Sequence, residues 1–282
     1  MKFLTYQLPD GRTRPGVLEG AMIRTISTET LREYIALAPH ERIAWHAADE
    51  LIPFEGVTLD APVRPSRNVF CVGRNYLEHA LEGARVAGRE LKLPSVPTFF
   101  TKASTAIAAP GSTLRLSARI SSEYDYEAEL AVVIGAQCKD VAENEALHVV
   151  FGYTALNDVT ARDLQRAHGQ WFKGKSLDST CPIGPWIVTP DEVGDPQSLE
   201  IGFELNGVQK QRSNTGKMIF SIARLIAELS KGMTLLPGDV IATGTPEGVG
   251  FARNPPEFLA SGDRLEVKIE RIGSLRNVVR IE

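Results

Sequence analysis

The residues that could do chemistry are most concentrated between positions 123 and 129. Four acidic side chains stand there at every second position: Glu123, Asp125, Glu127 and Glu129. Alternate residues of a β-strand share a face, so the pattern predicts a strand with four carboxylates along one side, continuing into a buried apolar run at 130–134. Like charges repel and a buried carboxylate is costly unless compensated. Either the acidic end is exposed to solvent or a hard cation lies between Glu127 and Glu129, and the strand alone leaves both alternatives open.

A histidine and a glutamate stand three residues apart, at His79 and Glu82, within a predicted helix over 77–87. Residues at this spacing share a helix face and can form a hydrogen bond. Such a bond could orient one imidazole nitrogen and leave the other free as a general base. The alternative is an exposed helix with an incidental pair. Gly83 and Gly88 predict hinges, which would suit a lid that orders on binding.

A second polar cluster is predicted at 158–165, where Asp158 is placed as the N-cap of a helix. Asp158, Arg162 and Gln165 would then share one face, at i, i+4 and i+7. The alternative is an ordinary cap on a solvated helix. The loop that follows carries Lys173 and Lys175 among aromatic residues and glycine.

The glycine-rich stretch at 244–250, GTPEGVG, contains Thr245 and matches neither the dinucleotide nor the P-loop pattern, which argues against nucleotide binding. Its glycines would let backbone N–H groups approach an anionic ligand closely. Polar groups at the ends of strands and helices are typical of small-molecule sites.

The composition of the chain narrows its class. It has 282 residues, 43% of them hydrophobic and 23% charged, a net charge of −4, and a pI of about 5.8. The hydrophobic and charged fractions predict a globular protein that can bury a hydrophobic core. The negative net charge and the acidic pI argue against nucleic-acid or anionic-membrane partners. Three scattered cysteines indicate reduced thiols. With no visible signal peptide and no apolar run near the roughly 20 residues of a spanning helix, we expect a soluble cytoplasmic protein.

Short strands dominate the predicted elements, so the expected fold class is a mixed, β-dominated α+β fold. Residues 1–65 are predicted to form a small β-rich domain. Its expected elements are strands at 2–8, 14–18 and 22–26 and a helix over 28–50 that is interrupted at Pro39. His40 and His46 in that helix are interpreted as core or surface residues. A proline-bearing linker at 61–66 leads to a larger domain, 66–282. Its clearest local signals are an Asn206-Gly207 hairpin and an amphipathic helix over 218–229.

The ordered motifs of this larger domain resemble the fumarylacetoacetate hydrolase family. The matching stretches are VGRNYLEHALE (72–82), YDYEAELAVVIG (124–135), FGYTALNDVTARDLQ (151–165), GKSLDSTCPIGPWIV (174–188) and PGDVIATGTPEGVG (237–250). The resemblance covers about residues 66–282. It implies a mixed β-roll catalytic domain, a small N-terminal β-rich domain and a homodimer.

The resemblance also implies roles for individual residues. Glu127, Glu129 and Asp158 match the ligands of one divalent ion per subunit, and an all-carboxylate set suits Mg²⁺ or Mn²⁺. Glu123 and Asp125 are expected outside this ligand set. His79 and Glu82 match a lid dyad in which Glu82 orients His79 as general base. The residues matched to substrate binding and charge stabilisation are Arg162, Gln165, Lys175 and Thr245, with Arg74 and Tyr76 as further substrate contacts.

The implied activity is hydrolysis of a C–C bond in a 2,4-dioxo acid, an acylpyruvate or a diketo-deoxy sugar acid, which releases pyruvate and a carboxylic acid. Family members that cleave fumarylacetoacetate carry a further aspartate near the segment matching 73–76, and none is present here. The chain is therefore similar to the three-carboxylate branch. The same site could serve an oxaloacetate decarboxylase or a 2-hydroxyhepta-2,4-diene-1,7-dioate isomerase. The hypothesis from another class is a non-catalytic protein that binds carboxylates or assembles with partners.

Overall fold

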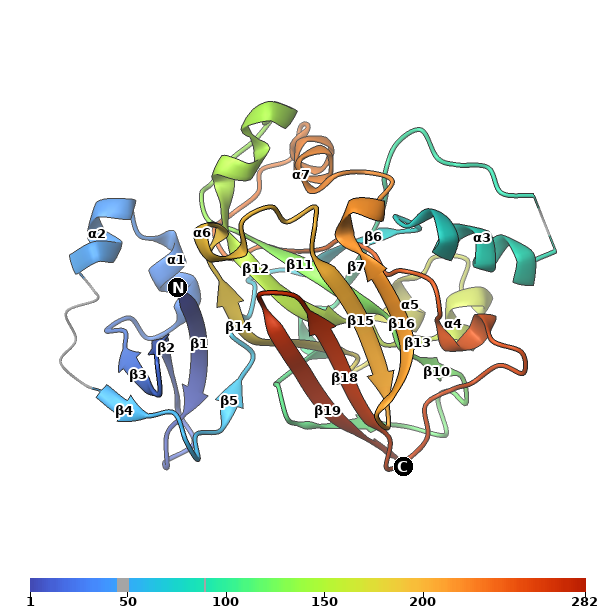
Figure 1. Ribbon diagram of the computed structural model, residues 1–282, viewed down its shortest axis with the longest axis horizontal. Coiled ribbons are helices and arrows are strands. Elements are labelled where there is room, and N and C mark those ends of the chain that lie inside the picture. The colour runs from blue at the N-terminus through green and yellow to red at the C-terminus, as the bar shows by residue number, and fades with distance from the viewer. Residues whose placement is uncertain (45–50, 89) are drawn as a thin grey trace.

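Most of the chain forms β-sheets, in a computed structural model that describes residues 1–44, 51–88 and 90–282 (Figure 1). The largest sheet has the strand order β4-β3-β2-β1-β14-β12-β11-β17-β6-β7, with β5 paired to β1 and β8 to β14. Its strands are β1 (Lys2–Gln7), β2 (Thr13–Glu19), β3 (Met22–Thr25), β4 (Leu51–Pro53), β5 (Leu59–Asp60), β6 (Val69–Gly73), β7 (Thr98–Lys102), β8 (Ile107–Ala108), β11 (Ala128–Ile134), β12 (Val150–Asn157), β14 (Cys181–Val188) and β17 (Val240–Ala242). Both antiparallel and parallel pairs occur, so the sheet is mixed.

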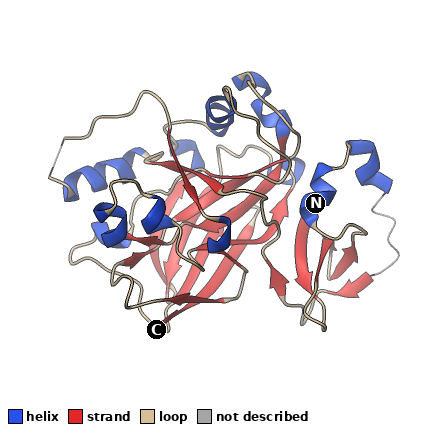
Figure 2. Ribbon diagram, turned by 180° about the vertical axis from the view of Figure 1, so that it is seen from behind, coloured by secondary structure: helices blue, strands red, loops and turns tan. Residues whose placement is uncertain are grey.

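A five-stranded sheet, in the order β16-β15-β18-β19-β9, packs against β11 and β12. Its strands are β9 (Thr113–Leu116), β15 (Glu200–Leu205), β16 (Val208–Asn214), β18 (Arg264–Ile269) and β19 (Gly273–Ile281). A separate pair joins β10 (Tyr124–Asp125) to β13 (Thr160–Ala161). Figure 2 shows the sheets at the centre and the helices at the periphery. The expected mixed, β-dominated fold is confirmed.

The helices of the described residues are short. They are α1 (Leu31–Ala36), α2 (Pro39–Ala44), α3 (Leu77–Val86), α4 (Arg162–Ala167), α5 (Phe172–Lys175), α6 (Pro190–Val193) and α7 (Ile222–Ser230), with 3₁₀ turns at 104–106, 143–149, 215–217 and 250–252. No helix in these three described ranges is long and apolar enough to cross a membrane. Within its described part, the predicted helix over 28–50 is two helices, α1 ending at Ala36 and α2 beginning at Pro39, because proline is tolerated in the first turn of a helix but not in its interior; residues 45–50 lie outside the described residues. His40 is exposed, and His46 lies outside the described residues.

Strand β11 shows why the apolar run at 130–134 is buried on both faces. Leu130 and Val132 contact one hydrophobic cluster, which includes Phe203 of the five-stranded sheet. Ala131 and Val133 point the other way, into the cluster that contains Phe3. The period of two along a strand therefore assigns alternate side chains to two cores, and β11 lies between them.

The N-terminal segment is hydrogen-bonded into the large sheet. Lys2 and Phe3 of β1 pair with Val188 and Ile187 of β14. The Phe3 ring lies 4.9 Å from the ring of Phe151, on β12. In Figure 1 this segment forms the blue end of the molecule, beside β14. The division into domains near residue 65 remains a prediction from the sequence.

Local signals located some elements better than others. The Asn206-Gly207 hairpin is confirmed, with left-handed φ values of 55° and 81° joining β15 to β16. The helix expected over 218–229 instead begins at Ile222, where the Ser221 hydroxyl accepts a hydrogen bond from the Arg224 N–H and so caps it. The placement of Asp158 as a helix N-cap is wrong. Helix α4 begins at Arg162, and its N-cap residue Ala161 makes no side-chain capping bond.

Candidate active site

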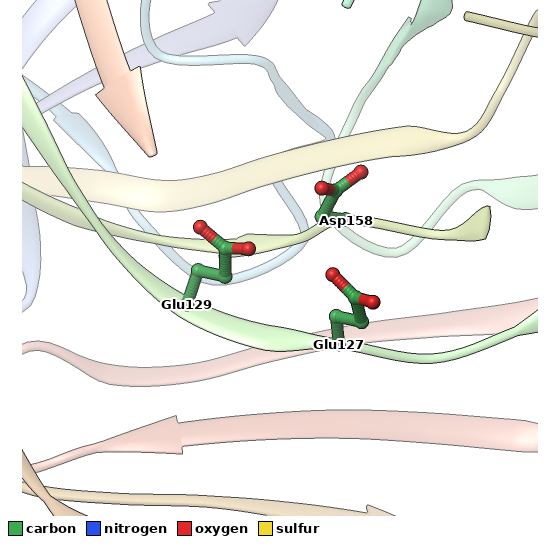
Figure 3. Close-up of side chains that lie close together, drawn as sticks. All are labelled: Glu127, Glu129 and Asp158. Atoms are coloured by element: carbon green, nitrogen blue, oxygen red, sulfur yellow. The ribbon is translucent and has the colours of Figure 1, made fainter. Parts of the chain in front are cut away.

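Three carboxylates meet where β11 and β12 run side by side. Ala128 of β11 pairs with Asn157 of β12, and the Asp158 N–H donates to the Glu127 carbonyl oxygen over 2.9 Å. This register places Asp158 beside Glu127 and Glu129, and each of the three offers an oxygen within 4.8 Å of the others (Figure 3). All three side chains are buried. Burial of three like charges in one place requires compensation by cations.

Two lysines supply part of that compensation. Lys175 Nζ lies 2.7 Å from Glu127 Oε2 and 2.7 Å from Asp158 Oδ2. Lys102 Nζ, fully buried at the end of β7, lies 2.6 Å from Asp158 Oδ1 and donates to the Val159 carbonyl oxygen. The sequence analysis gave Lys102 no role. The available signal was a lysine at the end of the apolar segment TFFTK, where burial demands a charged partner.

Glu127 and Glu129 differ in how far their charge is neutralised. Burial opposes ionisation of Glu127, but Lys175 and Arg162 outweigh it and hold its pKa at about 2. Burial and the charges of Asp158 and Glu127 raise the pKa of Glu129 well above its usual value. Glu129 Oε2 accepts a hydrogen bond from the Gly244 N–H over 2.7 Å. No cationic side chain of the described residues forms an ion pair with Glu129.

This donor set fits a small divalent cation. Three carboxylates offer oxygen ligands within reach of one point, and hard ions such as Mg²⁺ and Mn²⁺ prefer oxygen. Burial is the main cause of the raised pKa of Glu129, followed by the charges of Asp158 and Glu127, and a bound cation would favour its ionised form. Of the two alternatives for the acidic segment, solvent exposure does not apply to Glu127 or Glu129, because both are buried.

Asp125 does not share a strand face with these glutamates. The expected continuous strand is interrupted after Asp125, because β10 pairs with β13 while β11 joins the large sheet. The Asp125 carboxylate instead accepts hydrogen bonds from the backbone N–H groups of Gly250 (2.7 Å) and Phe251 (3.1 Å). Glu123 lies nearer the surface, 2.7 Å from Arg166. The prediction of four carboxylates along one side is therefore wrong.

Arg162 connects Asp125 to the cluster. Its Nε and Nη2 lie 2.9 and 2.8 Å from Asp125 Oδ2, and Nη2 lies 2.6 Å from Glu127 Oε1. Nη1 donates to Gln165 Oε1 over 3.1 Å, and the guanidinium carbon lies 4.4 Å from the centroid of the Phe251 ring. Arg162 is thus fixed from three sides beside the carboxylates. Fixed donors of this kind suit recognition of a substrate carboxylate.

His79 and Glu82 form the hydrogen bond that their spacing predicts. His79 Nδ1 lies 3.0 Å from Glu82 Oε1, and both side chains are largely buried, so the pair is not an incidental one on an exposed helix. The Glu82 carboxylate also accepts from the Gly248 N–H, at 3.2 and 3.0 Å. This second contact attaches α3 to the glycine-rich stretch 244–250. His79 and Glu127 both line the cavity.

A cavity of about 780 Å³ opens above the cluster, between α3 and the α4–α5 segment. The predicted site residues on its wall are Arg74, His79, Glu127, Glu129, Arg162, Gln165, Lys175 and Thr245. Glu82 and Asp158 are not on the wall. Glu82 is hydrogen-bonded to His79, and Asp158 accepts a hydrogen bond from Lys175, so each contacts a residue that lines the cavity. Tyr76 is not on the wall: it is buried in the core, and its hydroxyl finds no hydrogen-bond partner in the described part of the chain.

The structure is a β-dominated protein with three buried carboxylates at the ends of two neighbouring strands and a His–Glu pair at the same cavity. The family model described as fumarylacetoacetate (FAA) hydrolase C-terminal matches residues 68–280, and the chain belongs to this family.

Several known proteins resemble the chain over most of its length. It is 46% identical over 224 residues to oxaloacetate tautomerase YisK of Bacillus subtilis (strain 168), covering 79% of this chain and 73% of that protein. It is 40% identical over 275 residues to 2,4-didehydro-3-deoxy-L-rhamnonate hydrolase of Sphingomonas sp. (strain SKA58), covering 95% and 93%.

Solved structures agree with this assignment. Fumarylacetoacetate hydrolase from psychrophilic Exiguobacterium antarcticum has a TM-score of 0.86 at 39% identity and covers 100% of both chains. The 2-hydroxyhepta-2,4-diene-1,7-dioate isomerase from Mycobacterium marinum has a TM-score of 0.80 at 36% identity and covers 100% of this chain and 99% of that one. The expected fold of the family is thereby confirmed, whereas the names of the relatives cover three kinds of reaction.

Proposed function

We propose that this protein is a divalent-metal-dependent hydrolase that cleaves a C–C bond of a 2,4-dioxo acid, releasing pyruvate and a carboxylic acid. The observation that carries the proposal is the preformed His79–Glu82 pair on the same cavity as the three buried carboxylates. Hydrolysis needs a general base that takes a proton from the attacking water, and this base must lie beside the groups that bind the 2-oxo acid. In this proposal His79 supplies the base, and the carboxylate cluster on the same cavity supplies the metal site that holds the 2-oxo acid.

Each residue has a task in this proposal. Glu127, Glu129 and Asp158 hold Mg²⁺ or Mn²⁺, which would act as a Lewis acid towards the oxygens of the 2-oxo acid. Arg162 and Thr245 bind and orient the substrate carboxylate. Glu82 accepts from the Nδ1–H of His79, so that Nε2 has the lone pair that takes a proton from water.

Water then attacks C4, and the Lys175 ammonium and Gln165 amide donate to the oxygen that becomes negative there, a contribution of about 3 kcal/mol per donor. The C3–C4 bond breaks. C3 takes up a proton and the three-carbon fragment leaves as pyruvate, while C4 leaves as the carboxyl carbon of the second acid. Lys175 is already buried at the cavity wall, which favours a strong interaction with the developing charge.

Tautomerisation of oxaloacetate is the second candidate, supported by the 46% identity to a protein of that name. It needs a proton to be moved at C3 and no water to be activated, and His79 could move that proton. Decarboxylation of oxaloacetate and isomerisation of an unsaturated 2-oxo diacid would use the same carboxylate cluster. A homodimer and a cytoplasmic location are part of the proposal through the family resemblance.

A coupled pyruvate assay tests the proposal. The panel contains acylpyruvates, diketo-deoxy sugar acids and oxaloacetate, each with Mg²⁺, Mn²⁺ or EDTA, and the enol absorbance of oxaloacetate is followed in parallel. Metal-dependent release of pyruvate together with an acid co-product from a dioxo acid is the expected result. Accelerated loss of the oxaloacetate enol without pyruvate from any dioxo acid would replace hydrolase by tautomerase. Pyruvate from oxaloacetate alone would indicate a decarboxylase.

A further inference from the structure

Lys102 is a buried charge that the proposed reaction does not use. Its side chain is fully buried at the end of β7, and Lys102 is not among the residues of the cavity wall. Its Nζ donates to Asp158 Oδ1 over 2.6 Å and to the Val159 carbonyl oxygen over 3.0 Å. Because it contacts a proposed metal ligand but not the cavity, any effect of Lys102 on the reaction must act through Asp158.

Two lysines hold the Asp158 carboxylate, one on each oxygen. Lys102 Nζ lies 2.6 Å from Oδ1, and Lys175 Nζ lies 2.7 Å from Oδ2. The chain segments that carry the two lysines are also joined, because the N–H of Ala103 donates to the hydroxyl of Ser176 over 3.0 Å. Rotation of the Asp158 carboxylate would therefore break at least one charge-assisted hydrogen bond.

This arrangement restricts how Asp158 can bind a cation. A carboxylate binds an ion through one oxygen or through both. Contact through both oxygens would bring a divalent ion close to both ammonium groups, which repel it. Contact through one oxygen leaves the ammonium on the other oxygen farther from the ion, so the two lysines favour Asp158 as a one-oxygen ligand.

The two glutamates of the cluster differ in the same respect. Both Glu127 oxygens have a cationic partner, since Arg162 Nη2 lies 2.6 Å from Oε1 and Lys175 Nζ lies 2.7 Å from Oε2. Glu129 accepts a hydrogen bond from the Gly244 N–H, and no cationic side chain in the described part of the chain pairs with it. Glu127 is therefore restricted in the same way as Asp158, and Glu129 is not.

We propose that Lys102 is a positioning residue that makes the carboxylate cluster select Mg²⁺ or Mn²⁺ over Ca²⁺, by keeping Asp158 a one-oxygen ligand. Mg²⁺ demands near-octahedral coordination and usually keeps several waters, whereas Ca²⁺ takes about six to eight oxygens and binds carboxylates through one oxygen or both. A cluster that offers few oxygens suits the smaller ion. The inference rests on the metal site of the proposed function and is independent of which bond is cleaved.

Binding of the metal alone tests this apart from turnover. Calorimetry on protein stripped with EDTA and dialysed would measure the dissociation constants of Mg²⁺ and Ca²⁺ for wild type and Lys102→Gln. Mg²⁺ should bind wild type more tightly than Ca²⁺, and the ratio of the Ca²⁺ constant to the Mg²⁺ constant should fall about tenfold in the variant. A purely structural role would change both constants by the same factor, as would the loss of one positive charge beside two ions of equal charge.

Arg67→Gln is the matched control, because it takes the cationic partner from another buried carboxylate, Asp239, which is not on the cavity wall. It should leave the ratio unchanged, and an equal fall there would overturn the inference. An unchanged ratio in Lys102→Gln, or wild-type protein that binds Ca²⁺ as tightly as Mg²⁺, would overturn the inference alone. If neither ion binds wild type, the metal site of the proposed function fails and the inference fails with it.

Infrared spectroscopy covers the case in which Lys102→Gln does not fold. Coordination through one oxygen widens the separation of the two carboxylate stretching bands, and coordination through both narrows it. The difference spectrum of wild type with and without Mg²⁺ should contain a widened component. Absence of that component would overturn the inference.

Discussion

Replacing Glu129 by glutamine should stabilise the metal-free protein at neutral pH and weaken its response to Mg²⁺. The pKa of Glu129 in the folded protein is raised by burial and by the charges of Asp158 and Glu127. A carboxyl group with a raised folded pKa favours the folded state below its ordinary pKa of 4.5, and this contribution is lost as the pH rises towards the folded pKa. Glutamine has nearly the same size and no charge to lose.

The magnitude follows from linkage. Within that pH window the wild-type protein loses up to about 1.4 kcal/mol per pH unit relative to Glu129→Gln. Each pH unit of that window therefore corresponds to up to about 3 °C in Tm, at roughly 2 °C per kcal/mol. Mg²⁺ at about 100 times its Kd should raise the wild-type stability by about 2.7 kcal/mol, and the variant, with two carboxylates left, by less.

Thermal unfolding at pH 5 and pH 7, with EDTA or with Mg²⁺, measures both effects. The control is Glu127→Gln, two residues away and also buried. Lys175 and Arg162 hold the pKa of Glu127 at about 2 against the effect of burial, so its charged form stabilises the protein above its ordinary pKa of 4.5. Loss of that charge should destabilise the metal-free protein at neutral pH by about 3 kcal/mol. Shifts in the same direction for the two variants in EDTA would refute the assigned charge balance.

Three further predictions concern the groups around the cavity. His79→Ala should abolish hydrolysis of dioxo acids with little change in the affinity for Mg²⁺, and retention of most turnover would exclude His79 as the base. Glu82→Gln should lower kcat about 10²-fold or more, because an amide does not stabilise the imidazolium form of His79 and does not fix the tautomer of its neutral form. An unchanged kcat would show that Glu82 has only a structural role, through its contact with the Gly248 N–H. Asp125→Asn should raise KM by about tenfold or more with a smaller change in kcat, because it removes the charge of one of the two carboxylates that hold Arg162. Steady-state kinetics would contradict this if kcat alone fell.

The sequence predicted the parts of the site that depend on short-range spacing. The His79–Glu82 hydrogen bond follows from the three-residue spacing of the pair on a helix. The burial of Leu130 and Val132 follows from an uninterrupted apolar run. The approach of Asp158 to Glu127 depends on the register of β11 with β12, which no local pattern defines. It was inferred through the family resemblance instead.

The errors have a common physical origin, which is long-range hydrogen bonding. Asp125 was expected beside the glutamates because it alternates with them, but N–H groups about 125 residues away, at Gly250 and Phe251, stabilise it elsewhere. Lys102 was not assigned a role, because its partner Asp158 is 56 residues distant in the chain. In both cases a charged side chain is buried by a loop that sequence spacing does not bring near it.

The pairing of β1 with β14 has a consequence for how this protein can be shortened. A fragment that starts at residue 66 would leave part of β14 as an unprotected edge, with free N–H and C=O groups opposite Ile187 and Val188. It would also expose Phe151, now covered by Phe3. Exposed edges and aromatic patches promote self-association. We therefore expect that residues 66–282 expressed alone yield a larger insoluble fraction than the full chain, measured by sedimentation of the two lysates.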